Sequence, residues 1–287
     1  TVLTAQYDRT LPRYEELHGV HVVRVPVFAR ISKGVLMPTI GIVAGKLVAS
    51  HDAISLHLPQ LDASGIALRG RLLRKPTVLT YHSDLTLPAS LLSAAANCVV
   101  DLSNQVAARL CDVICAYTDD FARHSRLLAG HLSKVRYILP PVEMPTVEST
   151  GVSAWAARYG LDGAAPVVGV AGRLAAEKGI EFLLEALPRL LEVHPGLRVL
   201  HAGPVDDVIG EKRYRRRLRS VLEHFADRYT FLGVLDPEDM AHFFSNCDVH
   251  VLPSVNSTET FGLVQIEAAL CGTPTVASAL PGVRVPT

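Results

Sequence analysis

Short runs of β-branched and apolar residues alternate with longer stretches of helical periodicity along almost all of this 287-residue chain. Strands and helices that alternate at this spacing form βαβ units, so the pattern predicts an α/β fold built on parallel sheets. The strands expected in the first half are Thr1–Tyr7, Val20–Val27, Ala53–Leu58, Thr77–His82, Val113–Tyr117 and Val135–Leu139. The helices expected between them are Val35–Ala49, Leu61–Leu73, Ala89–Leu110 and Asp119–Ala129.

The stretch from Pro140 to Gly151 has the composition of a linker. We therefore expect two domains, residues 1–147 and residues 148–287. The strands expected in the second domain are Val167–Val170, Arg198–His201, Thr230–Leu232, Val249–Leu252 and Thr275–Ala277. Two Rossmann-like, doubly wound parallel-sheet domains are expected to face each other across a cleft, with ligands at the carboxyl ends of their strands.

Two helices of the second domain are predicted from their side-chain pattern. The segment Lys178–Val193 has its apolar residues on one helical stripe, and Pro188 inside it is expected to kink the helix. The basic run Lys212–Arg219 is interpreted as a solvated helix face, and a phosphate or membrane patch is the alternative. The residues expected to turn inward from that helix are Tyr214, Leu218, Val221 and Leu222.

The composition excludes several classes of protein. Lys+Arg and Asp+Glu both number 28, so the chain lacks the positive charge that a nucleic-acid partner would need. Its 5 cysteines have neither disulfide-framework nor zinc spacing, which indicates reduced thiols. With no signal peptide, the sequence predicts a cytoplasmic protein. A D-x-D triplet, a Walker loop and hydrolase motifs are absent, so we expect no metal and no cofactor.

The most apolar stretches, Val35–Ser50 and Ala89–Val100, are shorter than the roughly 20 apolar residues that span a bilayer. We expect them to be buried helices. The first half of the chain has a small excess of basic residues, which suits an acidic acceptor or membrane headgroups. Peripheral contact with the inner face of a membrane therefore stays open as an alternative.

The turn within Gly169–Gly179 is the first candidate for a binding site. A strand ends, glycines allow a tight turn, and Arg173 and Lys178 bracket the turn before a helix begins. Arginine offers a planar fork and lysine a mobile point charge, and two such cations after a strand suit a diphosphate. The nicotinamide-binding pattern G-x-G-x-x-G is absent from this turn.

The second candidate is a pair of glutamates around a helix start. Glu259 lies in the loop before a helix predicted at Leu263–Cys271, and Glu267 lies about one turn into it. Free N–H groups near Gly262 and Leu263 suit a phosphate. One carboxylate on either side of that anion site suits the hydroxyls of a sugar and of a ribose.

A third candidate is His82, within Thr80–Asp84 at the carboxyl end of a strand of the first domain. A histidine at this place is expected to face the cleft. A structural role is the alternative.

Taken together, these segments resemble the group 1 (family 4) retaining glycosyltransferases. The resemblance covers most of residues 166–284 in the expected order and is looser in the first half, where Thr80–Asp84 carries it. The matching segments of the second half are Gly172–Gly179, His201–Pro204, Phe231–Gly233, Asp248–Ser254, Glu259–Glu267, Gly272–Ala277 and Leu280–Arg284.

The resemblance implies a GT-B fold and a transferase of hexosyl type. Arg173 and Lys178 would hold the donor diphosphate, and His82 would lie over the sugar from the acceptor side. Glu259 would bind the transferred sugar and Glu267 the ribose. Backbone groups of Gly262 and Leu263 would contact phosphate or sugar, completing a site with no metal.

The same resemblance implies the substrates and the extent of the chain. A UDP- or GDP-sugar would be the donor, and a sugar or a lipid-linked molecule the acceptor. A first strand with a glycine-rich loop and a C-terminal end are expected to be missing, so the chain alone is expected to bind donor poorly or to be inactive. A nucleotide-sugar epimerase or phosphorylase of the same fold, and a non-catalytic nucleotide-sugar-binding protein, remain the alternatives.

Overall fold

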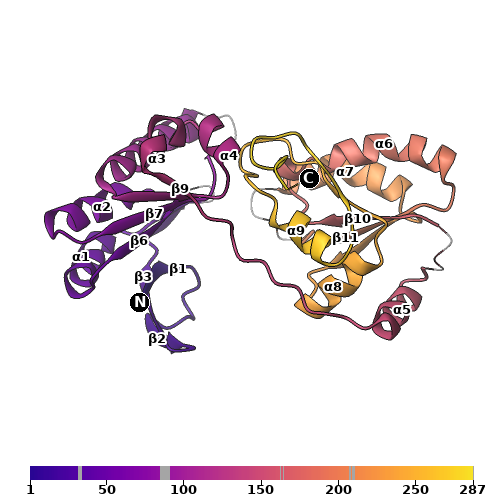
Figure 1. The fold of residues 1–287 in the computed structure, drawn as a ribbon, viewed down its shortest axis with the longest axis horizontal. Coiled ribbons are helices and arrows are strands. Elements are labelled where there is room, and N and C mark those ends of the chain that lie inside the picture. Colours follow the sequence, from indigo (N-terminus) through magenta and orange to yellow (C-terminus); the bar gives the residue numbers. More distant parts are fainter. Residues whose placement is uncertain are drawn as a thin grey trace. The chain divides into compact units, whose positions relative to one another are not determined.

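The structure, a computed structural model, describes residues 1–31, 34–84, 91–161, 163, 165–206, 208 and 211–286; of Ile31 and residues 91–96 it describes only the backbone. The chain divides into two compact units, Thr1–Ile138 and Leu139–Thr287 (Figure 1). The boundary predicted from the composition of the linker, after residue 147, lies within the second of these units. Parallel strands dominate the described sheets of both units, so the prediction of an α/β fold is confirmed.

A four-stranded sheet forms the core of the first unit, and its strands run in parallel in the order β6-β7-β8-β9. Their bounds are β6 (Ile54–Leu58), β7 (Thr77–Tyr81), β8 (Val113–Ala116) and β9 (Val135–Tyr137). Helices α2 (Ala63–Leu72), α3 (Leu91–Leu110) and α4 (Asp119–His124) pack on one face of it. Because side chains alternate along a strand, Leu56 and Leu79 face this apolar core and their neighbours face away.

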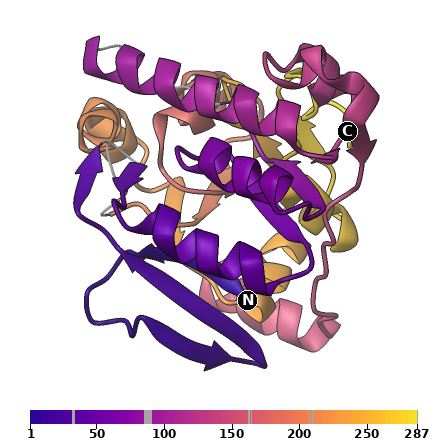
Figure 2. The ribbon, with the colours of Figure 1, turned by 90° about the vertical axis from the view of Figure 1, so that its left-hand side faces the viewer.

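Among the described residues of the first unit, two smaller sheets and a further helix accompany this sheet (Figure 2). A three-stranded sheet has the order β1-β3-β2, with β1 parallel and β2 antiparallel to β3. The bounds are β1 (Val2–Gln6), β2 (Tyr14–Leu17), β3 (Val20–Pro26), β4 (Ala29–Ile31), β5 (Gly34–Leu36) and α1 (Ile40–Ser50). Strand β2 and the β4–β5 hairpin were not predicted from the sequence.

Two helices expected in the first unit have different bounds. The helix expected from Val35 begins only at Ile40, because Val35 pairs with Arg30 in the β4–β5 hairpin. The helix expected over Asp119–Ala129 is interrupted at Ser125, whose backbone is extended and whose hydroxyl accepts the Leu128 amide. Short 3-10 turns follow, η1 (Leu128–Gly130) and η2 (Leu132–Lys134).

The second unit is a five-stranded parallel sheet covered on both faces. Its order is β12-β11-β10-β13-β14, with β10 (Val167–Ala171), β11 (Arg198–Ala202), β12 (Tyr229–Gly233), β13 (Val249–Leu252) and β14 (Thr275–Ala277). Helices α6 (Ile180–Val193) and α7 (Lys212–His224) contribute to the apolar cluster on one face. Helices α5 (Ser149–Arg158), α8 (Pro237–Ser245) and α9 (Leu263–Leu270) contribute to the cluster on the other.

The predicted helices of this unit formed with small differences. Helix α6 continues through Pro188 to Val193. In α7, Tyr214 and Leu218 are buried as expected. Val221 is 37% exposed, so the prediction that it turns inward was wrong. Within the described ranges, no helix combines the length and the apolar character that crossing a membrane requires.

Candidate functional site

Three glycines end three neighbouring strands of the second unit. Gly172, Gly203 and Gly233 follow or end β10, β11 and β12, and each has a positive φ. Gly172 N–H donates to Ala202 O at 2.8 Å, and Gly203 N–H donates to Gly233 O at 2.7 Å. A Cβ on Gly203 would overlap the carbonyl group of Gly172. The strand ends therefore pack backbone against backbone, which fixes the turn that carries the two predicted cations.

His201 supports this turn from inside the sheet. It is fully buried, its Nε2 donates to Gly172 O at 2.9 Å, and its Nδ1 accepts from the Tyr229 hydroxyl at 2.7 Å. Burial lowers the pKa of His201 to about 4, and the Gly172 carbonyl opposes that shift only in part. The ring is neutral at pH 7 and holds the backbone of Gly172 in place.

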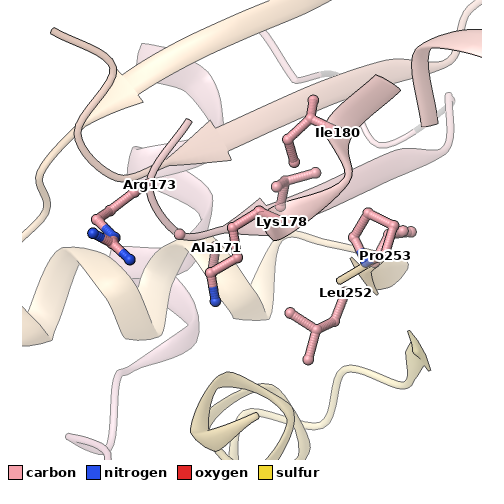
Figure 3. Close-up of a pocket in the computed structure, with 9 residues that line it drawn as sticks. Ala171, Arg173, Lys178, Ile180, Leu252 and Pro253 are labelled. Carbon is pink, nitrogen blue, oxygen red and sulfur yellow. The ribbon is translucent and has the colours of Figure 1, made fainter. Parts of the chain in front are cut away.

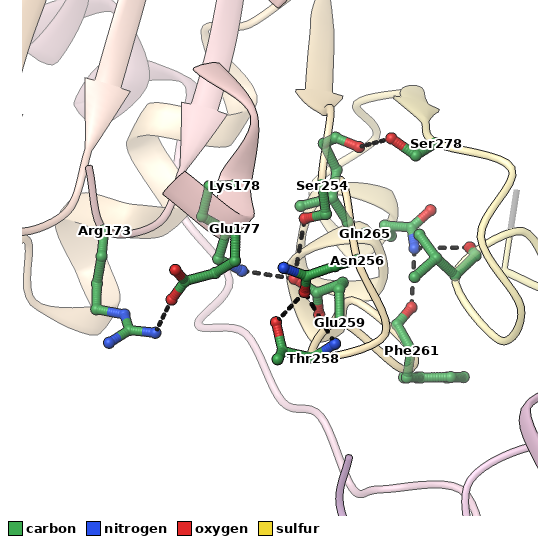
Figure 4. A network of polar contacts seen from close by, with 12 residues as sticks. Arg173, Glu177, Lys178, Ser254, Asn256, Thr258, Glu259, Phe261, Gln265 and Ser278 are labelled. Atoms are coloured by element: carbon green, nitrogen blue, oxygen red, sulfur yellow. Dashed lines mark hydrogen bonds and ion pairs between the residues drawn. The ribbon is translucent and has the colours of Figure 1, made fainter. Parts of the chain in front are cut away.

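Arg173 and Lys178 lie at the two ends of the turn, each beside a carboxylate (Figure 4). Arg173 Nη2 is 2.8 Å from Glu177 Oε1, and the Arg173 side chain is 49% exposed. Lys178 Nζ is 2.5 Å from Glu259 Oε2, in a pair of which only 22% and 16% of the side chains are exposed. The Lys178–Glu259 pair joins residues 81 positions apart, so the β10–α6 turn and the β13–α9 loop meet at one place.

The β10–α6 turn contains a 3-10 helix, η3 (Ala176–Lys178), and is stabilised by contacts with neighbouring loops. Glu211 Oε2 accepts the Ala176 amide at 3.0 Å, and Val255 N–H donates to Glu177 O at 3.0 Å. Gly179 has φ +61°, and a Cβ there would overlap the carbonyl oxygen of Pro253. Only glycine therefore allows the β13–α9 loop to lie this close to the turn.

The loop that carries Glu259 has a defined hydrogen-bonded conformation. Ser254 Oγ donates to Glu259 Oε2 at 3.3 Å, and Asn256 Oδ1 accepts the Thr258 amide at 3.1 Å. Gly262 is the N-cap of α9 in the left-handed region, and as a glycine it offers no side chain to the first amides of the helix. A Cβ on Gly262 would lie 2.6 Å from Leu252 Cδ2, so this helix start also requires glycine.

Glu267 lies one turn into α9, as predicted. It is half-buried, and among the described residues its carboxylate has no hydrogen-bond or ion-pair partner. Burial raises the pKa of Glu267 above its usual value. A carboxylate in this state gains stabilisation from any ligand hydroxyl that donates to it.

A small hollow at the strand ends is lined by Arg173 and Lys178 on one side and by Leu252 and Pro253 on the other (Figure 3). Its walls combine cationic heads with apolar side chains of β10 and β13. These groups of the second unit therefore come together at the carboxyl ends of β10 and β13, which are neighbouring strands.

In the first unit, His82 follows β7 directly. Its Nε2 is 2.9 Å from His57 Nδ1 and its Nδ1 is 2.6 Å from the Tyr117 hydroxyl. Burial, and to a smaller extent the neighbouring His57, lowers the pKa of His82. Its position at a strand end agrees with the expectation, whereas His57 and Tyr117 were not singled out.

Other members of the site were also missed. Glu177 could have been found, because it stands four residues after Arg173. Glu211 and Ser254 carry no local signal in the sequence. Glu211 bonds to Ala176, which is distant in sequence, and Ser254 bonds to Glu259 within a loop that has no periodic pattern. No group of three or more His, Cys, Asp or Glu is placed to hold a metal ion among the residues that the structure describes.

The fold and the site define a class of protein: a pair of α/β units, one of which presents cations, carboxylates and a free helix start at neighbouring strand ends. A family model described as "Glycosyl transferases group 1" matches residues 153–285. A second, "Glycosyl transferase 4-like domain", matches residues 1–141. Between them the models cover nearly the whole chain, and the chain belongs to the group 1 glycosyltransferases.

Curated relatives agree with this family. A D-inositol 3-phosphate glycosyltransferase of Segniliparus rotundus is 30% identical over 180 residues, 59% of this chain and 39% of the relative. An uncharacterised glycosyltransferase of Methanocaldococcus jannaschii is 27% identical over 305 residues, 98% of this chain and 72% of the relative. A glycogen synthase of Mycobacterium tuberculosis is 38% identical over 144 residues, 48% of this chain and 32% of the relative. Two of these alignments thus span only 39% and 32% of the relative's length.

Solved structures share the fold. Anabaena HepE in complex with UDP-glucose has a TM-score of 0.71 at 20% identity, covering 93% of this chain and 69% of that one. Sucrose-phosphate synthase from Thermosynechococcus elongatus has a TM-score of 0.71 at 22% identity, covering 98% and 71%. These likenesses identify the fold as GT-B, as the sequence analysis expected.

Proposed function

We propose that this chain carries out, or forms the core of a protein that carries out, retaining transfer of a sugar from a nucleotide-diphosphate sugar to an acceptor hydroxyl. The observation that carries the proposal is the meeting of Lys178 with Glu259, 2.5 Å apart, beside Arg173 and the open start of α9. Cations for a diphosphate and an acceptor of sugar hydroxyls are thus adjacent. The family of the chain supports the same activity.

Each proposed role follows from the chemistry of the group. Arg173 and Lys178 bind the diphosphate and neutralise the charge that develops on it as it leaves. Backbone groups of Gly262 and Leu263 contact phosphate or sugar. Glu267 accepts the ribose hydroxyls, which suits a half-buried carboxylate with no partner among the described residues.

The reaction centre is assigned to Glu259 and His82. Glu259, whose Oε2 binds Lys178 and Ser254, is proposed to accept hydroxyls of the transferred sugar and to position it, as the family resemblance implies, and not to act as the nucleophile. His82 contacts the sugar from the acceptor side. The acceptor oxygen attacks the anomeric carbon on the face from which the diphosphate leaves. The carbon–oxygen bond to the diphosphate breaks with its electron pair, and the departing oxygen takes the acceptor's proton.

The substrates are proposed as classes. UDP or GDP is the carrier, and the solved HepE complexes contain UDP and UDP-glucose. The acceptor is a sugar or a lipid-linked molecule, and neither a metal nor another cofactor takes part.

In α2, Leu68 and Leu72 are exposed near Arg71 and Arg74, which suits peripheral contact with an anionic membrane. Sedimentation with phosphatidylglycerol vesicles at low salt should pellet the protein, and a protein left in solution contradicts that contact.

Calorimetric titration with UDP and with GDP tests the donor site. We expect one of them to bind, and the double variant Arg173→Ala with Lys178→Ala to lose at least about tenfold in affinity, since charge-assisted bonds to phosphate contribute about 1.5–3 kcal/mol each. The matched control is Arg213→Ala with Arg216→Ala, which removes two exposed cations from α7. Equal affinity of the two double variants contradicts the assignment.

Product analysis separates the alternatives. A transferase requires an acceptor and retains the anomeric configuration, which proton NMR of the product reads directly. An epimerase converts the donor without an acceptor, and a phosphorylase requires phosphate. Donor binding without transfer or slow donor hydrolysis, over a panel of acceptors, points to a non-catalytic binding protein.

A further inference from the structure

Three side chains of the first unit form a continuous hydrogen-bonded chain. They are His57 on β6, His82 after β7 and Tyr117 after β8, so they come from three neighbouring parallel strands. His57 Nδ1 is 2.9 Å from His82 Nε2, and His82 Nδ1 is 2.6 Å from the Tyr117 hydroxyl. The two imidazole rings are stacked, with centroids 5.1 Å apart and planes 14° from parallel.

The chain lies on the face of the sheet opposite to the apolar core. Leu56 and Leu58 flank His57 in β6 and both face that core, so His57 faces away. Tyr81, just before His82, and Ala116, just before Tyr117, are also members of the core. The alternation of three strands therefore brings these polar side chains to one surface, and the packing of the core fixes their backbones.

The contacts restrict where the protons lie. The 2.9 Å contact between the two imidazoles holds one proton, because two N–H groups cannot point at each other. Burial raises the pKa of Tyr117, so its phenol keeps its proton, and we infer that this proton is donated to His82 Nδ1. His82 then carries its proton on Nε2 and donates it to His57, whose remaining nitrogen is 3.5 Å from the Ser55 hydroxyl.

We propose that His57 and Tyr117 are positioning residues for His82, which hold its imidazole neutral, in one tautomer and in one orientation. The inference rests on the proposed function in one respect, the contact of His82 with the transferred sugar. Positive charge builds on the sugar ring as a glycosidic bond breaks, so an imidazolium beside it would oppose the reaction. Because His57 and Tyr117 together bind both ring nitrogens of His82, they set its tautomer, its neutral charge and the orientation of its ring.

Further titratable groups lie near this edge of the sheet and are engaged elsewhere or neutral. Asp84 accepts from the Tyr81 hydroxyl at 2.9 Å and from Ser125 Oγ at 2.7 Å. Asp119, in α4, is bonded to Arg123 and to Tyr137. Burial raises the pKa of Cys115 in β8, so its thiol is uncharged. The charge of His82 therefore depends chiefly on burial and on His57.

Imidazole NMR of the 287-residue chain tests the proposal without any substrate. Long-range proton–nitrogen spectra of protein labelled with 15N-histidine report the tautomer of each ring, and His82→Gln assigns the signal. We expect His82 to show the Nε2-protonated neutral tautomer at pH 7. In Tyr117→Phe and in His57→Gln its nitrogen shifts should move towards an average of the two tautomers, with its titration about half a pH unit or more higher.

Two control variants match these changes in size. Tyr137→Phe removes a phenol oxygen bonded to Asp119, and His51→Gln removes an imidazole bonded to Thr1 and Leu47. Both should leave the His82 signal unchanged. If Tyr117→Phe and His57→Gln also leave it unchanged, the proposed positioning role is overturned.

Transfer kinetics then distinguish this inference from the proposed function. Tyr117→Phe should lower kcat by roughly tenfold and change the donor KM by less than about twofold, because orientation and not binding is lost. The positioning role is contradicted if His82→Gln impairs transfer while Tyr117→Phe and His57→Gln both keep the kcat of the wild type. Unimpaired transfer by His82→Gln contradicts instead the assignment of His82 in the proposed function.

Discussion

Single residues with no chemical function determine the shape of the donor side. Gly172, Gly203 and Gly233 let three strand ends approach one another, and Gly179 and Gly262 let the β13–α9 loop and α9 begin where they do. Gly172, Gly203 and Gly233 look alike in sequence, since each stands at the end of a strand. They differ in what a side chain would meet, which only the packing defines.

Gly203→Ala and Gly233→Ala separate backbone strain from steric overlap. Both positions have positive φ, but a Cβ on Gly233 meets nothing within 4 Å, whereas on Gly203 it overlaps the Gly172 carbonyl group. We expect Gly233→Ala to lower the free energy of unfolding by about 1 kcal/mol and Gly203→Ala by about 3 kcal/mol or more. Urea denaturation followed by fluorescence of Trp155, the single tryptophan, reports the second unit. Equal losses would show that the overlap is relieved.

Buried His201 predicts an acid-sensitive second unit. Its pKa is about 4 in the folded protein and about 6.5 when unfolded, so below pH 6.5 the unfolded chain binds the extra proton. Stability is therefore complete above pH 6.5 and is lost as the pH falls towards 4. The group accounts for about 2 kcal/mol of loss at pH 5, relative to pH 7.5.

Urea denaturation of the wild type and of His201→Gln at those two pH values measures this loss. The difference between the two pH values should shrink by about 2 kcal/mol in the variant. His194→Gln, which changes an exposed histidine of the same unit, is the control. A pH dependence unchanged in His201→Gln contradicts the prediction.

At the scale of elements, the site is made where two loops meet. The β10–α6 turn supplies Arg173 and Lys178, and the β13–α9 loop supplies Glu259. Because β10 and β13 are neighbouring parallel strands, their carboxyl ends lie side by side. The charge of Lys178 is matched by Glu259, so a diphosphate must share this lysine.

This pairing predicts opposite effects of one substitution on binding and on turnover. In Glu259→Gln, Lys178 keeps a hydrogen-bond partner but loses the competing charge, so UDP should bind about three- to tenfold more tightly. Transfer should fall by at least about a hundredfold, because the sugar loses a carboxylate acceptor. Calorimetry with UDP and a transfer assay measure the two effects. Weaker binding of UDP to the variant would show that Glu259 does not compete for Lys178.

At the scale of the whole molecule, the chain divides its tasks between two units. The proposed diphosphate and ribose contacts all come from Leu139–Thr287, while the His57–His82–Tyr117 chain comes from Thr1–Ile138. Each unit has its own apolar core. Binding and positioning can therefore be measured separately in one protein.

This division predicts that UDP stabilises the two units unequally. At a hundredfold excess over Kd, UDP should raise the free energy of unfolding of the second unit by about 2.7 kcal/mol, as reported by Trp155. Hydrogen exchange at Leu79 and Ile114, in the core of the first unit, should stay unchanged. Equal protection of both units by UDP would contradict a donor site built from the second unit alone.

The sequence determined most of the elements and most of the chemical groups. Alternation of strand and helix patterns placed the parallel strands, with β13 and β14 at their predicted bounds. Glycines and charges at strand ends indicated Arg173, Lys178, Glu259, Glu267 and His82, since the carboxyl ends of parallel strands are where ligands bind.

Only the tertiary structure decided which of these groups meet. Lys178 pairs with Glu259 across 81 residues, and His82 lies between His57 and Tyr117, because strand order sets neighbours that no local pattern encodes. The structure also corrected two predictions: Val35 pairs in a hairpin and does not begin a helix, and Val221 is exposed and does not turn inward. Local periodicity records which side of an element is apolar, whereas contacts between distant loops depend on how the sheet is ordered and how closely its strand ends pack.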